Sequence, residues 1–420
     1  MAQDIVFEHA TVIDATGAPP RQDVSVALAA GRIVSIAKDV KPAPGTRLID
    51  ATGKFLIPGL WDMHVHLDPQ GNALRALAAS GVTGIREMYS GIPIATLAAW
   101  RARPDNPRIV AAGFLDGPLM LNAGPAPPDA YAVGTAEQAR LAIALLAAAG
   151  ADFLKVYNSL PRDAYFAIAQ ESKRLGIPFA GHVPEAVSPA EASEAGQRSQ
   201  EHLINILLAC STREQELRRE RIALMNSQVI SGEEQELQLG FPDPQGLFDT
   251  YDDTKAATLF KTFVKNATWH TPTLALLQSF LADKNRARGM AYMKVLTPEQ
   301  FDAWIERIGV LLERYKKLVG DMHRAGVEFL AGTDSGPNTP ASPGTSLHDE
   351  LELFVESGFT PMEALQTATR NPARYLGKLQ EMGTLEPGKV ADMVLLDANP
   401  LDDIRNTRKI SLVVLRGRVN

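Results

Sequence analysis

Cysteine is almost absent from this sequence, which has one, Cys210, among 420 residues. A single thiol excludes an internal disulfide framework, so folding depends on apolar burial. The hydrophobic fraction of 45% is ample for a large buried core. Long apolar runs are also absent, since none approaches the roughly 20 residues that a membrane-spanning helix needs. We therefore expect a large globular chain without a membrane partner.

The sequence also has no excess of positive charge. It contains 42 Lys and Arg residues and 49 Asp and Glu residues, so its net charge is −7. No Lys/Arg run appears, so the sequence gives no basis for nucleic-acid binding. No basic segment followed by an apolar one opens the chain, which predicts a cytoplasmic location for the sequence as given. A periplasmic or secreted location would require a signal removed ahead of it. We expect a small-molecule substrate, with a homo-oligomer as the default assembly.

Both ends of the chain have the pattern of short strands. Residues 1–57 alternate apolar and polar side chains between glycines at 17, 31, 45 and 53, which is typical of hairpins. Residues 379–420 continue in the same style. Neither end can close a β domain alone, so the pattern predicts one small β-sandwich built from both termini.

Between residues 58 and 378 the pattern changes to alternating strands and helices, which indicates parallel α/β architecture. Eight such units over about 300 residues predict an α/β fold with a (β/α)8 TIM-like barrel. The expected strands are 60–66, 82–87, 107–112, 152–157, 177–182, 198–203, 267–272 and 327–333. Residues 211–266 form an oversized helical insertion after the sixth strand, and such insertions often act as lids.

The first barrel strand ends in His64-Val65-His66. Residues two apart on a strand face the same side, so both imidazoles project toward one point and form half of a metal site. A lone pair of this kind is a weak signal.

Further ligand-type residues fall at the ends of other strands. His182, His202 and Asp334 each follow an apolar strand, at the edge where barrel enzymes place their active sites. Any one of them alone would be an ordinary polar residue, but together they indicate a metal centre.

Lys155 lies inside a predicted strand, where the period-2 pattern turns it to the same face as Phe153 and Tyr157. A lysine inside a barrel is costly unless it is paired, and an ion pair with Asp334 is one explanation. The alternative is that burial beside cations lowers its pKa, so that the neutral amine takes up carbon dioxide. The resulting carbamate would bridge two metal ions.

These residues resemble the ligand set of the amidohydrolase superfamily. The segments 57–64 and 383–392 are similar to its strand-one and C-terminal signatures, and 332–335 (Gly-Thr-Asp-Ser) to its aspartate motif. The chain most resembles the imidazolonepropionase-related group, which includes metal-dependent Xaa-Pro and carboxypeptidase-like dipeptidases. The resemblance spans nearly the whole chain.

The resemblance implies a binuclear centre of two divalent cations, for which we expect zinc. His64, His66 and Asp334 would hold the first ion, His182 and His202 the second, and carboxylated Lys155 would bridge them. A metal-bridged hydroxide would be the nucleophile, with Asp334 as general base and then acid. The expected reaction is cleavage of an amide C–N bond, in a dipeptide or an N-acyl amino acid with an apolar side chain.

Three further residues have two interpretations each. Tyr157 and His270, at the end of the seventh strand, are candidates for stabilising the oxyanion, but packing or a structural role explains them equally well. Arg86 could clamp a substrate carboxylate, although an ion pair with Glu87 or Asp62 is the better explanation.

Two other functions stay open. His182 and Glu185 have the His-x-x-Glu spacing of a mononuclear deaminase, in which the glutamate shuttles protons, and a cyclic-amide or lactone hydrolase fits the same frame. A non-catalytic scaffold on the same fold is more remote, because no expected ligand is missing.

Overall fold

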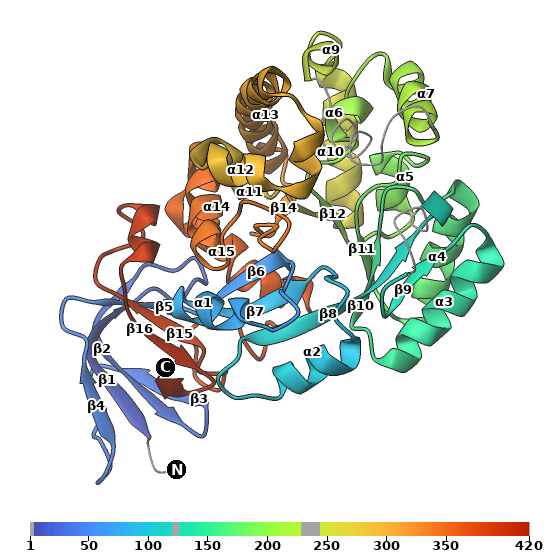
Figure 1. Cartoon of the computed structure of the whole chain (residues 1–420). Helices are drawn as coiled ribbons and strands as arrows, with labels where there is room; N and C mark the ends of the chain where they lie inside the picture. The colour runs from blue at the N-terminus through green and yellow to red at the C-terminus, as the bar shows by residue number, and fades with distance from the viewer. Residues whose placement is uncertain (1–3, 120–125, 228–243, 420) are drawn as a thin grey trace.

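The computed structural model describes residues 4–119, 126–227 and 244–419. Two sheets organise these residues, one from the chain termini and one from the central segment (Figure 1). The predicted α/β fold, with a barrel and a terminal β unit, is confirmed. No described helix is long and apolar enough to cross a membrane.

The terminal sheet has eight strands in the order β17-β16-β15-β5-β1-β2-β3, with β4 also paired to β1. Strand β5 lies between β1 and β15, so it joins the N-terminal and C-terminal strands into one sheet. Apolar side chains that include Phe7, Val26 and Met393 form its core. The strands are β1 (Ile5–Val12), β2 (Arg21–Ala29), β3 (Arg32–Ala37), β4 (Arg47–Asp50), β5 (Phe55–Pro58), β15 (Met393–Leu396), β16 (Ile410–Leu415) and β17 (Arg418–Val419).

Eight parallel strands form the barrel, and all eight fall inside the predicted segments or within a few residues of them. They are β6 (Leu60–Val65), β7 (Val82–Glu87), β8 (Arg108–Asp116), β10 (Phe153–Val156), β11 (Phe179–Gly181), β12 (Ser199–Glu201), β13 (Trp269–Thr271) and β14 (Glu328–Phe329), with β9 (Ala130–Ala132) beside β8. The predicted last strand is shorter than expected. Its continuation still closes the barrel against β6, because Met63 N donates to Ala331 O and His66 N to Ser335 O, both at 2.8 Å.

Gly59 is the only residue between β5 and β6, so it links the two sheets directly. A Cβ at this position would lie 2.3 Å from the Thr83 side chain. Glycine has no Cβ, so it is the only residue that avoids this clash. Its N–H donates to the Asp392 carbonyl at 2.8 Å. The terminal sheet thereby fixes where β6 starts, and with it the position of the two histidines at its end.

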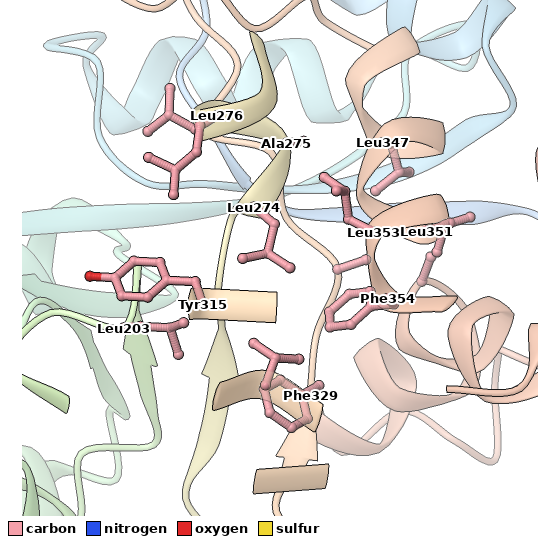
Figure 2. Close-up of a cluster of buried hydrophobic side chains, with 14 of the residues drawn as sticks. Leu203, Leu274, Ala275, Leu276, Tyr315, Phe329, Leu347, Leu351, Leu353 and Phe354 are labelled. Atoms are coloured by element: carbon pink, nitrogen blue, oxygen red, sulfur yellow. The ribbon is translucent and has the colours of Figure 1, made fainter. Parts of the chain in front are cut away.

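Helices cover the outside of the barrel (Figure 1). They are α1 (Ala73–Ala79), α2 (Ile94–Arg101), α3 (Ala136–Ala149), α4 (Arg162–Leu175), α5 (Pro189–Glu194), α6 (Ile206–Ala209), α7 (Glu214–Met225), α9 (Pro244–Phe248), α10 (Asp253–Asn266), α11 (Leu274–Ala282), α12 (Lys284–Gly289), α13 (Pro298–Arg324), α14 (Thr345–Glu356), α15 (Pro361–Thr367) and α16 (Arg370–Tyr375), with 3-10 turns η2 (Ala291–Val295) and η3 (Ile404–Arg408). Figure 2 shows the apolar layer beneath α14, where Phe329 of β14 lies 5.9 Å from Phe354 between ring centroids.

The insertion predicted after β12 is helical in its described part, which includes the charged helix α7 and the later helix α10. Helix α7 has no buried residue, yet it contacts the loop after β11. Arg218 donates to the carbonyls of Glu185 and Val187, at 3.2 and 2.8 Å. Residues 228–243 of the predicted insertion lie outside the described residues.

Candidate metal centre

His64 and His66 lie at the end of β6 and both reach Asp334, which follows β14. Oδ1 of Asp334 is 3.3 Å from Nε2 of His64 and 3.1 Å from Nε2 of His66. Asp334 has a φ of +55°, a left-handed backbone conformation that non-glycine residues rarely adopt outside functional sites. Its N–H donates to the His64 carbonyl at 2.8 Å, which fixes the aspartate against β6.

The second histidine pair adjoins the first. His182 follows β11 and His202 follows β12, and their ring centroids are 4.8 Å apart. The His202 ring is in turn 4.4 Å from the His64 ring. Ligand atoms of His64, His202 and Asp334 all lie within 4.8 Å of one another, a spacing that suits a shared metal ion. The structure thus brings together four histidines and one aspartate that are spread over 271 positions in the sequence.

All four imidazoles are oriented in the same way, because each Nδ1 has an oxygen partner and each Nε2 is left for the centre. The partners are the Glu201 carboxylate for His64 (2.9 Å), the Tyr89 carbonyl for His66 (2.7 Å), Asn158 Oδ1 for His182 (2.7 Å) and Thr273 Oγ1 for His202 (2.7 Å). The Thr273 hydroxyl donates to the Pro272 carbonyl, so it accepts from His202. Such partners fix the tautomer of metal-binding histidines.

The protonation states suit cation binding. Burial, followed by the neighbouring charge of Lys155, lowers the pKa of His64 and of His182, and burial lowers the pKa of His202 to about 3. Burial opposes ionisation of Asp334, yet the neighbouring His202, His64 and His66 hold its pKa well below the usual value. His66 differs, because Asp334 raises its pKa against the effect of burial. Three neutral imidazoles and a carboxylate are therefore available at neutral pH.

His64 supplies a direct test of whether these residues fit a metal ion. Its Nε2 is buried and has no hydrogen bond of good geometry within the described part of the chain. An orphaned buried nitrogen is costly unless something binds it. The donor set of imidazole nitrogens and a carboxylate is the one that zinc and similar cations prefer. The site therefore fits divalent metal.

Lys155, on β10, is 1% exposed. Burial lowers the pKa of its ammonium to about 8. The ion pair with Asp334 considered from the sequence does not form, and the described carboxylates provide no other ion pair for this lysine. A buried, unpaired lysine is rare, which favours a chemical use for its amine.

Tyr157 lies beside the histidines, as the period-2 pattern predicts. Its ring centroid is 4.1 Å from that of His182 and 5.8 Å from Lys155 Nζ. Phe114 packs on its other side at 5.4 Å, and Tyr89 stacks on Phe114 at 4.6 Å. These three aromatic rings form a wall that leads to His182.

His270 does not lie at the metal centre, so its placement there from the sequence is corrected. Thr271, its neighbour on β13, contacts Arg86 inside the barrel, and His270 faces the opposite side. It packs against Phe263 of α10 at 4.5 Å and is fully buried. Burial lowers its pKa to about 3, and neither ring nitrogen has a hydrogen-bond partner among the described residues.

Arg86 has the structural role expected of it, with a different partner. It binds Glu201 rather than Glu87 or Asp62, with Nη2 at 2.9 Å from both carboxylate oxygens. Glu201 also holds His64, so the arginine supports a candidate metal ligand through one carboxylate. Burial opposes the anionic form of Glu201, but Arg86 and His64 bring its pKa well below the usual value. Glu201 was missed from the sequence.

Asp62 is a second supporting residue that was missed. Its carboxylate accepts from the hydroxyl of Thr333 at 2.6 Å and from the N–H groups of Thr333 and His64 at 3.1 and 3.2 Å. It therefore ties the start of the Asp334 turn to β6.

Glu185 is held by Arg221 and does not contact the candidate metal ligands in the described structure. Both of its carboxylate oxygens accept from Arg221 of α7, at 2.7 and 2.8 Å, and the side chain is 1% exposed. A proton shuttle has to reach the reacting atoms, so this arrangement argues against the deaminase interpretation.

Comparison with known proteins identifies the class. Residues 55–419 match the model of the Amidohydrolase family, and the chain belongs to this family. The match covers both the barrel and the C-terminal strands. The group suspected from the sequence is confirmed by the relatives.

Three similar proteins illustrate that group. The chain is 35% identical over 106 residues to an ochratoxinase of Aspergillus niger, which covers 25% of this chain and 21% of that protein. It is 40% identical over 99 residues to an imidazolonepropionase of Maricaulis maris, covering 21% and 24%. A putative prolidase from Bifidobacterium longum has a similar structure, with a TM-score of 0.71, 25% identity and coverage of 100% and 95%. The curated relatives are matched over only about a quarter of their length or less.

Proposed function

We propose that this protein is a binuclear metal-dependent hydrolase that cleaves the amide bond of a dipeptide or an N-acyl amino acid. The observation that carries the proposal is that four equally oriented histidines gather beside Asp334 and beside Lys155, which is buried and has no ion pair among the described residues. Similarity to an ochratoxinase, an imidazolonepropionase and a putative prolidase supports the proposal that the substrate contains an amide-type bond.

His64, His66 and Asp334 would hold one cation, and His182 and His202 the other. Lys155 would join the two after its amine nitrogen bonds to the carbon of carbon dioxide and loses a proton, which gives a carbamate. When bound, two divalent cations supply Lewis acidity, which activates water and polarises a carbonyl. Four histidines and one aspartate suit a single ion, so the bridging group is what the second ion depends on.

Asp334 is placed to move the protons of the reaction. Its carboxylate is held anionic by the surrounding imidazoles, so it can accept a proton from the attacking water. It then delivers that proton to the leaving nitrogen of the amide. Tyr157 contributes a hydroxyl group next to His182, where it can donate to the carbonyl oxygen as negative charge develops.

The aromatic wall of Tyr89, Phe114 and Tyr157 supports an apolar substrate side chain. Helix α7, tied to the loop after β11 by Arg218 and Arg221, is the part of the insertion proposed to cover this side of the centre. Closure of such a segment would exclude water from the amide bond.

A substrate screen tests the proposal. Zinc-loaded protein would be assayed against dipeptides, N-acyl amino acids, lactones and aminopurines, with the Asp334→Asn variant as control. We expect amide hydrolysis that the variant loses by at least about a hundredfold. Turnover of lactones or aminopurines alone, or activity that survives in the variant, would overturn the assignment.

A further inference from the structure

A cavity lies on the opposite side of the barrel from the candidate metal centre. Its volume is about 750 Å³, and it is lined by Trp61, Arg108, Phe153, Pro178 and Arg198, among others. Each of these residues lies at or just before the start of a barrel strand, whereas the metal ligands follow the strand ends. We call it the floor cavity, and it is separate from the proposed catalytic centre.

The charge of the floor cavity is strongly positive. Its lining contains six cationic side chains, Arg86, Arg101, Arg108, Arg198, Lys378 and Arg416, against two acidic ones, Asp152 and Glu381. Four of the cations have carboxylate partners: Arg86 binds Glu201, Arg101 binds Asp152, Arg108 binds Asp392 and Lys378 binds Glu381. Among the described residues, Arg198 and Arg416 pair with no carboxylate. Asp392, which already pairs with Arg108, also accepts from the backbone N–H of Arg416 at 2.6 Å, but neither of these two guanidinium groups has a carboxylate partner of its own in the described part of the chain.

The contacts of these two arginines leave donors unused. Arg198 donates to the carbonyl of Tyr375, and Arg416 Nη2 donates to the carbonyl of Arg101 at 2.8 Å. Nε of Arg416 and Nε of Arg101 are buried and have no hydrogen-bond partner in the described part of the chain. Arginine donors removed from water are costly unless an acceptor reaches them. A guanidinium group that lacks a carboxylate partner would suit an acceptor with negative charge.

The rest of the lining is apolar. Trp61, Ile109, Val110, Phe153, Leu376 and Met382 contribute carbon surface to the same cavity. A hydrated inorganic ion would leave these apolar side chains exposed to water, whereas a molecule with an apolar group would bury them. The two kinds of lining together select an amphipathic anion.

From this combination, we propose that the floor cavity binds a small organic anion, whose carboxylate or phosphate pairs with Arg198 and Arg416 and whose apolar body packs against Trp61 and Phe153. Such a ligand would also adjoin Arg86, which lines the cavity and holds Glu201, the residue that orients His64.

Bromine-labelled probes test the site on the metal-loaded protein. Crystals soaked with 4-bromobenzoate should show an anomalous bromine peak beside Trp61 and Phe153. A bromine peak confined to the metal face of the barrel would overturn the proposal. This measurement needs no variant, so it stays decisive even if a substitution prevents folding.

Calorimetry supplies the second test, with 4-bromobenzoate and 4-bromobenzyl alcohol as a charged and an uncharged probe and inorganic phosphate as an anion without a body. We expect 4-bromobenzoate to bind at least about tenfold more tightly than the alcohol or the phosphate. We also expect Arg416→Gln to weaken the binding of 4-bromobenzoate by about tenfold. The matched control Arg405→Gln removes a charge from an exposed pair with Asp403 and should change the affinity less than twofold. Asp334→Asn should leave floor binding unchanged. Equal binding of the alcohol, or an unchanged affinity in Arg416→Gln, would contradict the assignment.

Discussion

The carboxylate of Glu201 lies 2.9 Å from Nδ1 of His64, and both side chains are fully buried. Glu201 therefore determines which nitrogen of His64 is free to bind a cation. The bidentate contact from Arg86 compensates the charge of Glu201 and fixes its orientation. The proposed metal ligand His64, its carboxylate support and a buried arginine form one chain of contacts inside the barrel.

Replacing Glu201 tests this chain. Glu201→Gln should lower metal affinity by about 10–100-fold, because support of a ligating histidine is weakened. It should also reduce the free energy of unfolding by about 3–5 kcal/mol, since Arg86 loses its buried anionic partner. Competition with a chelator and chemical denaturation measure the two effects. Glu216→Gln, which breaks an exposed pair with Arg213, is the control, and equal metal affinity in the two variants would exclude the proposed role.

His270 should be dispensable for catalysis. His270→Leu removes two buried nitrogens that lack partners in the described structure, and it leaves an apolar side chain against Phe263. We expect kcat within twofold of the parent and a gain in unfolding free energy of about 1 kcal/mol, because an unsatisfied polar group is removed. Steady-state assays and denaturation curves measure both. A decrease in kcat of more than tenfold, with the metal content retained, would show that His270 has a catalytic role.

Removal of the Tyr157 hydroxyl oxygen tests whether this residue stabilises the oxyanion. Tyr157→Phe keeps the ring contact with His182 and removes only the hydroxyl group. If that group stabilises the oxyanion, kcat should fall by about 10²–10³-fold while KM changes little. Tyr165→Phe, on α4, removes a buried hydroxyl group that binds Gln197 and should leave kcat unchanged. Equal kcat values for both variants and the parent would assign Tyr157 to packing alone.

The Lys155 amine gives a pH dependence for assembly of the centre. Burial disfavours the charged ammonium, so the pKa falls from 10.5 to about 8, and the neutral amine accumulates as pH rises through 8. Only the neutral amine reacts with carbon dioxide. At constant dissolved carbon dioxide, metal-free protein given zinc should therefore recover activity about 25-fold faster at pH 8.5 than at 6.5, and the rate should level off near pH 9. A rate still rising tenfold per pH unit above 9 would indicate an unperturbed lysine.

Much of this architecture could be predicted from the sequence. The period-2 pattern is local, and it placed His64 with His66 and Lys155 with Tyr157 on shared faces. Because parallel barrel strands end at one edge, the positions of His182, His202 and Asp334 along the chain predicted that they converge. Both deductions use only geometry that every barrel shares.

The rest depended on neighbours that are distant in the sequence. His270 falls at a strand end, but its direction depends on Thr271 facing Arg86, a contact between β13 and β7. Glu201 directly precedes His202, and its role appears only when β6 and β7 bring His64 and Arg86 beside it. One local signal was available, since Glu201 lies inside the predicted barrel strand 198–203, where an unpaired glutamate is costly.

Metal stoichiometry of the purified protein and its Lys155→Ala variant tests the central claim most directly. We expect two equivalents of divalent metal per chain in the parent, by elemental analysis of zinc-loaded protein, and no more than one in the variant. Electron density at Lys155 should extend beyond Nζ into a carboxylate group. One equivalent in both proteins, with an unmodified lysine, would contradict the two-metal account.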